Sequence, residues 1–373
     1  MTDRKIRVLV VDDSAIVRRL LSEALSSEPD IEVVGTAPDP FVARDKILAL
    51  EPDVVTLDIE MPRMDGITFL KKVMTHRPTP VIVISSLGQS GCHHALEALR
   101  HGAVEVLCKP GGPYSVGDFR TDLPNKVRAA AAARPRRAPA PEAAQPAAPS
   151  PAPAPPHPVP APSAGGRRLI AIGASTGGTE AIFQVLAALP ATAPPIVIVQ
   201  HIPAQFSRAF AARLDQHCRI RVREAMDGDT VGAGEALVAP GNFHMTLRRT
   251  PDGFRVHVFD GERVCYQRPS VDVLFDSVAK QVGRDATGVL LTGMGSDGAR
   301  GLLAMHQAGA HTIAQDEASC VVFGMPREAI RIGAASAILA LDHIAPHLTR
   351  LTAPASTGPA TSPRSASSCS LRS

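Results

Sequence analysis

Residues 169–178 read LIAIGASTGG, and this stretch decides how the second half of the chain folds. Its apolar residues 169–172 predict a buried strand, the small residues 173–178 a tight turn, and residues 179–189 a helix. The pattern G-x-S-x-G between a strand and a helix lifts a serine hydroxyl clear of the sheet, so Ser175 is a candidate nucleophile. On this stretch alone two other interpretations stay open: Ser175 or Thr176 caps the helix, or the turn binds phosphate.

The alternation of strands and helices continues beyond this stretch. Apolar runs predict strands at residues 196–199, 220–223, 236–239, 243–247, 254–259, 288–291 and 312–314. Helical spacing covers residues 205–217, 271–282 and 299–308. A Thr-Pro-Asp-Gly turn at residues 250–253 predicts an antiparallel hairpin appended to the sheet. The other predicted strands and helices alternate along the chain, which indicates a doubly wound, mostly parallel α/β fold.

Polar residues stand where three of these strands end: Ser175, His201 and Asp297. In a parallel sheet the carboxyl ends of neighbouring strands share one crevice. Serine needs a base to become a good nucleophile, histidine can supply it, and a carboxylate fixes the histidine tautomer. Singly, His201 could be structural and Asp297 a helix cap, but their joint placement favours a triad. The order Ser, His, Asp differs from that of α/β-hydrolases, so another doubly wound fold is expected.

A competing motif lies in the segment TGMGSDGARG. Gly293, Gly295 and Gly298 satisfy G-x-G-x-x-G after a predicted strand, and Asp316 follows about 20 residues later, as in dinucleotide-binding folds. This interpretation leaves Ser175 without a role and places the acidic Asp297 in a loop meant for a pyrophosphate. A receiver-regulated, nucleotide-binding oxidoreductase therefore stays as an alternative, as does a non-enzymatic module that binds partners when phosphorylated.

The first 120 residues show the same alternation. Strands are predicted at residues 6–11, 31–36, 54–57, 81–84 and 104–108, and helices at 14–26, 41–50, 66–76 and 92–101. This pattern indicates a flavodoxin-like (βα)5 unit with a parallel sheet. Asp12 and Asp13 follow the first predicted strand, and Asp58 follows the third. These three carboxylates would repel one another without a hard cation such as Mg²⁺. Ser85 and Lys109 beside them suit a phosphoryl group.

Composition divides the chain into an α/β unit at residues 1–128, an Ala/Pro-rich linker at 129–166, a second α/β unit at 167–352 and a disordered tail at 353–373. The net charge of +3, the absence of Trp and 3% aromatic residues disfavour nucleic-acid binding. No signal pattern or long apolar run is present, so a cytoplasmic protein without membrane insertion is expected. The six scattered cysteines predict neither disulfides nor a zinc site.

Residues 5–130 resemble the receiver domains of two-component response regulators, on the Asp-Asp pair, the segment LDIEMPRMDG around Asp58, Ser85 and the Lys-Pro dipeptide. The resemblance implies that Asp58 accepts a phosphoryl group from a histidine kinase. It further implies that Ser85 and Lys109 respond to the phosphate. The implied Mg²⁺ ligands are Asp12, Asp13, Asp58 and the backbone carbonyl of Glu60. Val106 stands where receivers often carry a switching aromatic residue, so that switch is not expected here.

Residues 168–350 resemble the catalytic domain of chemotaxis protein-glutamate methylesterases, the CheB family. The similarity rests on the segments GASTGGTEAI, VQHIP, APGNFH and LTGMGSDGARG and on the segment from Gln315 to Pro326. It implies hydrolysis of glutamate methyl esters on methyl-accepting chemotaxis receptors, with release of methanol, and deamidation of receptor glutamines. Ser175 would be the nucleophile, His201 the base and Asp297 its orienting carboxylate.

The same resemblance places the backbone N–H of Met294 in the oxyanion hole and Thr176 beside the nucleophile. It implies Mg²⁺ in the receiver and no cofactor in the catalytic domain. A monomer is expected, with the unphosphorylated receiver covering the crevice and phosphorylation weakening that packing.

Overall fold

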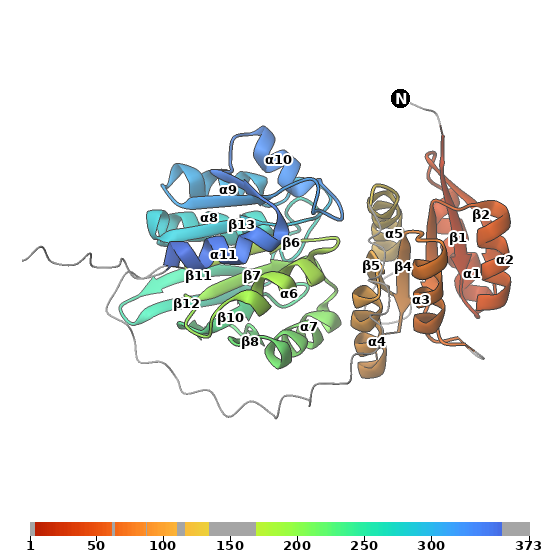
Figure 1. The fold of residues 1–373 in the computed structure, drawn as a ribbon, viewed down its shortest axis with the longest axis horizontal. Helices are drawn as coiled ribbons and strands as arrows, with labels where there is room; N and C mark the ends of the chain where they lie inside the picture. Colours follow the sequence, from red (N-terminus) through yellow and green to blue (C-terminus); the bar gives the residue numbers. More distant parts are fainter. Residues whose placement is uncertain (1–3, 62–63, 87, 110–115, 134–168, 353–373) are drawn as a thin grey trace, which may run out of the picture.

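The computed structural model describes residues 4–61, 64–86, 88–109, 116–133 and 169–352, which form two α/β domains (Figure 1). The N-terminal domain ends with helix α5 (Val116–Ala131), three residues beyond the predicted boundary at 128. Ala133 still packs in that domain's core. The predicted tail and nearly all of the predicted linker lie outside the described residues.

The N-terminal domain is a five-stranded parallel sheet in the order β2-β1-β3-β4-β5, which confirms the flavodoxin-like prediction. Helices α1 and α5 pack on one face of the sheet and α2, α3 and α4 on the other. The strands are β1 (Ile6–Val11), β2 (Ile31–Ala37), β3 (Val54–Asp58), β4 (Val81–Ser85) and β5 (Glu105–Cys108), and the other helices are α1 (Ala15–Ser26), α2 (Pro40–Leu50), α3 (Gly66–His76) and α4 (Gln89–Arg100).

The C-terminal domain is built on a seven-stranded parallel sheet in the order β15-β14-β13-β6-β7-β10-β8. Its strands are β6 (Leu169–Ala174), β7 (Ile196–Gln200), β8 (Arg221–Glu224), β10 (Glu235–Val238), β13 (Ala286–Leu290), β14 (His311–Gln315) and β15 (Ala337–Leu339). Its helices are α6 (Gly178–Ala188), α7 (Ala204–His217), α8 (Val271–Gln281), α9 (Ala299–Gln307), α10 (Met325–Arg331) and α11 (Leu341–Thr352), with a 3-10 turn at Gly283–Asp285. Fully buried apolar strands such as β6 explain why helices cover both faces of the sheet.

The predicted hairpin forms, but it is not part of the parallel sheet. Strands β11 (His244–Thr250) and β12 (Gly253–Phe259) pair antiparallel and join the short β9 (Thr230–Val231) in a separate three-stranded sheet. Met245 and Leu247 on one side of β11 pack into the same core as helix α8. The hairpin therefore covers a helix rather than extending the main sheet.

The strand order places a switch point in each sheet. In the C-terminal domain, β6 lies between β7 and β13, so the chain leaves β6 on one side of the sheet and returns on the other. In the N-terminal domain, β1 lies likewise between β2 and β3. Ligands bind such folds in the crevice at the carboxyl ends of the strands that flank the switch. Ser175 directly follows β6, and Asp12 directly follows β1.

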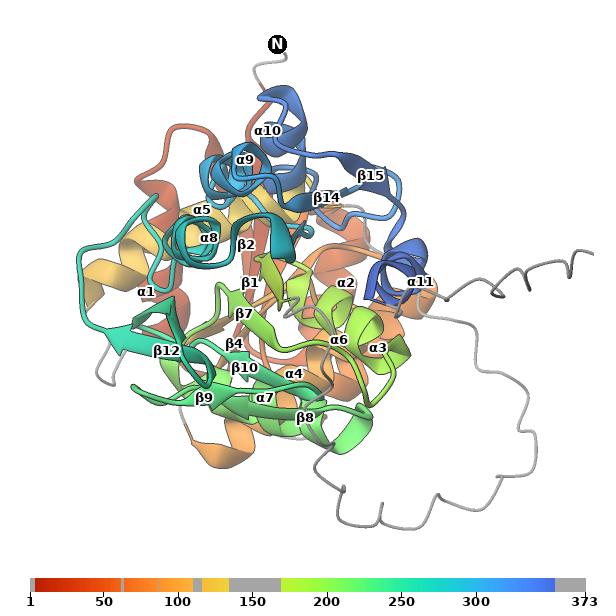
Figure 2. The same cartoon turned by 90° about the vertical axis from the view of Figure 1, so that its left-hand side faces the viewer.

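The two domains pack through α4, β5 and α5 of the N-terminal domain, which face the C-terminal domain in Figure 1. Leu96 of α4 belongs to the C-terminal core, and the fully buried Phe206 of α7 belongs to the N-terminal core. Figure 2, viewed from the side of the C-terminal domain, shows that domain in front of the other. The domains thus share apolar cores across their boundary.

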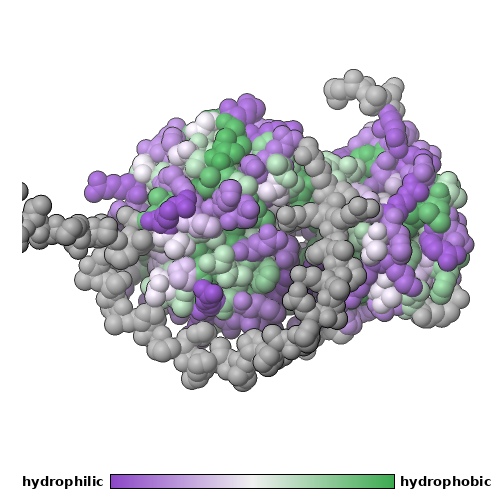
Figure 3. Space-filling model, in the orientation of Figure 1, coloured by the Kyte–Doolittle hydropathy of each residue, from purple (hydrophilic) through white to green (hydrophobic). Residues whose placement is uncertain are grey.

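The face of the molecule in Figure 3 is largely hydrophilic, with small separate apolar patches. Among the described residues, no helix combines the length and apolar character needed to cross a bilayer.

Candidate active site

Ser175 directly follows β6, at the turn into α6. Gly177 is the N-cap of that helix, with φ of +77°, and no side chain caps it, so the capping interpretation of Ser175 and Thr176 is wrong. A side chain at position 177 would meet Val321 at 2.6 Å and would also be strained by the positive φ. Gly177 thus lets the turn at Ser175 pack closely against Val321.

His201 follows β7, and its backbone N–H donates to the carbonyl of Ala174 at 3.1 Å. Its Nε2 atom lies 2.8 Å from Oδ2 of Asp297, and the two side chains are 3% and 2% exposed. The Nδ1 atom is buried and has no hydrogen-bond partner among the described residues. If Asp297 is ionised and the imidazole is neutral, Nε2 carries the proton and Nδ1 carries a lone pair that can accept one.

Asp297 follows β13 but does not cap the helix after it, because the N-cap of α9 is Gly298. Its carboxylate instead accepts the backbone N–H of Val271 at 2.7 Å and of Asp272 at 3.0 Å, at the start of α8. The hydroxyl of Ser270 also donates to it, at 2.8 Å. Burial alone would raise the pKa of Asp297, but these donors and His201 outweigh burial and lower that pKa. His201 first, and then the backbone N–H groups at the start of α8, therefore favour the charged carboxylate.

Ser175 and His201 line one small cavity but are not hydrogen-bonded to each other in the described structure. The cavity has a volume of about 10 Å³, and its other walls include Leu99, Glu105 and Val106 of the N-terminal domain. A water molecule barely fits such a volume. The N-terminal domain therefore closes the crevice at the strand ends.

Gln200 connects Ser175 and His201. Its side-chain amide donates to the backbone carbonyl of Ser175 at 2.8 Å and to that of His201 at 3.2 Å, and the residue is 2% exposed. A side chain at position 178 would come within 2.2 Å of Gln200 Oε1, so glycine is required there. The amide fixes the spacing between the two strand ends.

Met294 lies in the loop between β13 and α9. Among the described residues, none accepts a hydrogen bond from its backbone N–H. The loop is anchored on both sides: Gly293 donates to Val322 at 3.0 Å, and Ser175 donates to Thr292 at 3.0 Å. An N–H without an acceptor among the described residues, close to the turn at Ser175, is the kind of donor that an oxyanion requires.

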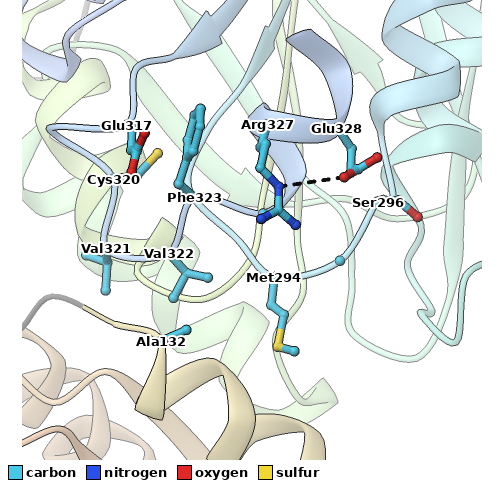
Figure 4. Close-up of a pocket in the computed structure, with 12 residues that line it drawn as sticks. Ala132, Met294, Ser296, Glu317, Cys320, Val321, Val322, Phe323, Arg327 and Glu328 are labelled. Carbon is cyan, nitrogen blue, oxygen red and sulfur yellow. Dashed lines mark ion pairs between the residues drawn. The ribbon is translucent and has the colours of Figure 1, made fainter. Parts of the chain in front are cut away.

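A second cavity, of about 700 Å³, borders the Met294 loop (Figure 4). In Figure 4, Ala132, which directly follows α5, lies opposite Met294 and Val322. Arg327 pairs with Glu328 at 3.7 Å. The remaining lining residues are Gly295, Ser296, Glu317, Cys320, Val321, Phe323 and Gly324. This space lies at the boundary between the domains and offers room that the cavity at Ser175 lacks.

The dinucleotide interpretation finds no support in the geometry. Asp316 accepts hydrogen bonds from the backbone N–H and the hydroxyl of Ser319, at 3.0 and 2.5 Å, and so closes a local turn. Asp297, inside the glycine loop, directs its carboxylate to His201. An ionised, fully hydrogen-bonded carboxylate would repel a pyrophosphate at this loop.

The predicted phosphoryl site comes together in the N-terminal domain. Carboxylate oxygens of Asp12, Asp13 and Asp58 lie within 4.8 Å of one another. Lys109 Nζ is 2.6 Å from Asp58 Oδ2 and 3.4 Å from Asp12 Oδ2, and the latter atom is buried without a hydrogen bond. The backbone N–H of Glu60 donates to Asp58 at 3.0 Å. The orphan Asp12 oxygen and the three acidic groups fit a hard divalent cation.

Burial raises the pKa of Asp58 to about 6, although Lys109 acts in the opposite direction. Ser85 is fully buried, and its hydroxyl donates to the backbone carbonyl of Gly91 at 3.1 Å, at the start of α4. Val106, which stands where receivers often carry an aromatic residue, is 3% exposed and packs in the core of the N-terminal domain.

Three polar residues near the site carry roles that the sequence did not assign: Glu105, Gln200 and Ser270. Glu105 had a visible signal, because it is a charged residue in an otherwise apolar strand, and it accepts the Thr176 hydroxyl at 2.7 Å. Ser270 precedes a helix, a common capping position, but its bond to Asp297 needs the tertiary fold.

Comparisons with known proteins find relatives of both domains. A family model described as CheB methylesterase matches residues 170–348, and one described as response regulator receiver domain matches residues 8–116. Protein-glutamate methylesterase/protein-glutamine glutaminase 2 of Syntrophus aciditrophicus (strain SB) is 55% identical over 347 residues, which are 93% of this chain and 99% of the relative. Protein-glutamate methylesterase/protein-glutamine glutaminase 4 of Anaeromyxobacter dehalogenans (strain 2CP-C) is 56% identical over 93% of this chain and 95% of the relative.

Among solved structures, the crystal structure of the Thermotoga maritima CheB methylesterase catalytic domain is 36% identical, with a TM-score of 0.48. It covers 49% of this chain and 98% of that chain.

Proposed function

This chain belongs to the protein-glutamate methylesterase/protein-glutamine glutaminase family, and we propose that Ser175, His201 and Asp297 carry its reaction. The enzyme is a chemotaxis hydrolase under the control of a receiver domain; it cleaves methyl esters of protein glutamates and amides of protein glutamines. The methyl-accepting chemotaxis receptors are the proposed substrate. A chemotaxis histidine kinase is the proposed phosphodonor, and the proposed location is the cytoplasm.

In the proposed mechanism, His201 Nδ1 takes the proton of the Ser175 hydroxyl as Oγ attacks the ester carbonyl. The backbone N–H of Met294 and the hydroxyl of Thr176 stabilise the tetrahedral oxyanion. Histidine then returns the proton to the leaving methanol or ammonia. Water, activated by the same base, hydrolyses the acyl-enzyme and leaves a glutamate carboxylate. Asp297 holds the tautomer and stabilises the imidazolium ion.

One observation carries this proposal: Asp297 occupies Nε2 of His201 at 2.8 Å, while Nδ1 is buried without a partner beside the cavity that Ser175 lines. A merely structural histidine would satisfy both nitrogens. The missing Ser175–His201 hydrogen bond fits a closed state, because catalytic hydrogen bonds often form only with substrate bound. One chain supplies all three side chains, so a monomer is the proposed active unit.

Regulation is proposed to act through the domain boundary. The N-terminal domain fills the crevice at Ser175 down to about 10 Å³, so the described arrangement is an inhibited one. Phosphorylation of Asp58 would recruit Lys109 and Ser85 to the phosphate and shift the population toward an open arrangement. Asp12, Asp13, Asp58 and the Glu60 carbonyl would hold Mg²⁺, which neutralises charge on the incoming phosphoryl group. The larger cavity beside Met294 is the proposed entrance for the substrate segment.

The deciding experiment measures methanol release from methylated receptor membranes by the full-length protein, with and without a small-molecule phosphodonor. We expect release by the wild type, an increase with phosphodonor, and no release by Ser175→Ala. Equal release by both proteins would refute the triad. Deletion of residues 1–160 should raise basal activity, and lower activity in a folded fragment would refute the inhibitory role of the receiver.

A further inference from the structure

Glu105 is a buried acid at the start of strand β5 and is only 7% exposed. Its Oε2 atom accepts a hydrogen bond from the Thr176 hydroxyl at 2.7 Å and pairs with Lys126 Nζ at 2.7 Å. The other oxygen accepts the backbone N–H of Val106 at 3.2 Å. A buried carboxylate is costly unless it is paired in this way. The N-terminal domain thus places a carboxylate that is paired with Lys126 against Thr176, the residue next to Ser175.

Glu105 also belongs to the wall of the crevice. It lines the same 10 Å³ cavity as Ser175 and His201, so its presence leaves no volume for a substrate glutamate. Thr176, the residue to which it binds, is 1% exposed in this closed arrangement. The Thr176 hydroxyl, which we propose to stabilise the substrate oxyanion, is therefore already hydrogen-bonded to Glu105.

The chemistry of that group matches the chemistry of the reaction. Hydrolysis of a glutamate γ-ester or of a glutamine amide leaves a γ-carboxylate on a protein glutamate, which is the same group that Glu105 carries. We propose that Glu105 is a built-in product analogue, whose carboxylate takes the position of the product carboxylate and so inhibits the unphosphorylated enzyme. This inference rests on the proposed function and specifies how the receiver inhibits it.

Lys126 explains why the analogue binds well although a true product must leave. Both Glu105 and Lys126 belong to the N-terminal domain, so the carboxylate arrives already paired with a cation. A product glutamate on a substrate protein would meet the same Thr176 hydroxyl without that lysine once the domains have separated. Because one chain carries both domains, Glu105 also has a higher effective concentration at the site than a glutamate on a separate protein. Inhibition is therefore strong in the closed state, and product release is easy in the open one.

The first test compares full-length unphosphorylated variants by methanol release and by the rate at which an organophosphorus ester labels Ser175. Glu105→Ala should raise both rates at least about tenfold, the effect of losing one charge-assisted contact. Asp122→Asn is the matched control, because Asp122 pairs with Arg263 across the same boundary, at 3.9 Å, with both side chains partly exposed. The control should change the rates less than about twofold, as exposed ion pairs do. Equal increases in both variants would overturn the proposal.

The second test asks whether the freed position recognises a carboxylate. N-acetyl-glutamic acid α-amide, which keeps its γ-carboxylate, should slow the labelling of Ser175 in Glu105→Ala but not in the unphosphorylated wild type. The norvaline analogue, which lacks the carboxylate, should not slow it. Adding Thr176→Val to Glu105→Ala should remove the protection. Absence of protection in Glu105→Ala would overturn the role of product analogue.

Glu105→Gln keeps the length of the side chain and its acceptor oxygen but loses the charge. It should give a smaller activation than Glu105→Ala, and it supports the same comparison if the alanine variant does not fold. Failure of the proposed function is recognised separately, because methanol release would then persist in Ser175→Ala whatever residue stands at position 105.

Discussion

His201 directs Nε2 to Asp297 at 2.8 Å, and its Nδ1 is buried without a hydrogen-bond partner among the described residues. In the proposed mechanism the carboxylate thus selects Nδ1 as the base. Asp297→Asn should lower kcat by about 10⁴-fold, because an amide can donate to Nε2 and so favour the wrong tautomer. Methanol release measures this loss.

The control for this variant is Asp276→Asn, which changes an exposed acid on α8 that does not contact the site. It should retain wild-type kcat. A fall of less than about tenfold in Asp297→Asn would contradict the assigned role, since orientation by the carboxylate would then matter little.

The lowered pKa of Asp297 predicts how stability depends on acid. The ordinary pKa of the group is 3.8, and the folded state holds it below this value. The unfolded chain therefore binds more protons in this range, and the contribution of Asp297 is complete above pH 3.8 and is lost as the pH falls through the folded-state pKa. Urea titrations should show the difference in unfolding free energy between wild type and Asp297→Asn narrowing below that pH. A constant difference would be evidence against this linkage.

Gln200→Met should reduce kcat by about 10²-fold with little change in KM, because the amide fixes the spacing of nucleophile and base without touching substrate. Methionine has a similar volume but cannot donate to the carbonyls of Ser175 and His201. A shifted pH profile of kcat would accompany the loss, whereas a purely structural role would lower the melting temperature and leave the profile unchanged. A matched control is Gln281→Met, on the exposed end of α8.

Removal of divalent cations should separate regulation from chemistry. EDTA is expected to abolish activation by a phosphodonor, because the acidic cluster at Asp58 needs a cation to approach a phosphoryl group. Hydrolysis without phosphodonor should not change, since the proposed triad uses no metal. Restoring Mg²⁺ should restore activation in the wild type but not in Asp58→Asn. Activation that survives chelation would contradict the proposed cation site.

Much of the fold follows from local patterns. Strand β1 was predicted at its observed bounds, as was α3, because apolar runs and helical spacing mark them clearly. Helices α5, α10 and α11 and strands β9 and β15 were not predicted. The short α10 begins at Met325-Pro326 and carries only two turns of pattern, and β15 has three residues, only partly buried or exposed. Tertiary packing, not local sequence, decides such elements.

The site residues could be predicted because they are polar residues that follow the ends of predicted strands. Ser175, His201 and Asp297 follow β6, β7 and β13, and these three strands are direct neighbours in the sheet. Which ring nitrogen faces Asp297 could not be predicted, because that depends on the position of α8. The contact between Glu105 and Thr176 was equally inaccessible, since it joins residues 71 positions apart in two domains.

Strand β5 has four residues, from Glu105 to Cys108, and Lys109 follows it directly. Glu105 contacts Thr176 in the C-terminal domain, and Lys109 contacts Asp58, the proposed phosphorylation site. About 13 Å of extended backbone therefore connects the proposed phosphorylation site with the proposed active site. Extended backbone hardly compresses, and a shift of Lys109 along the strand must therefore displace Glu105. To place this hydrolase under a different input signal, a protein engineer would have to redesign this one strand, and the catalytic domain could stay as it is.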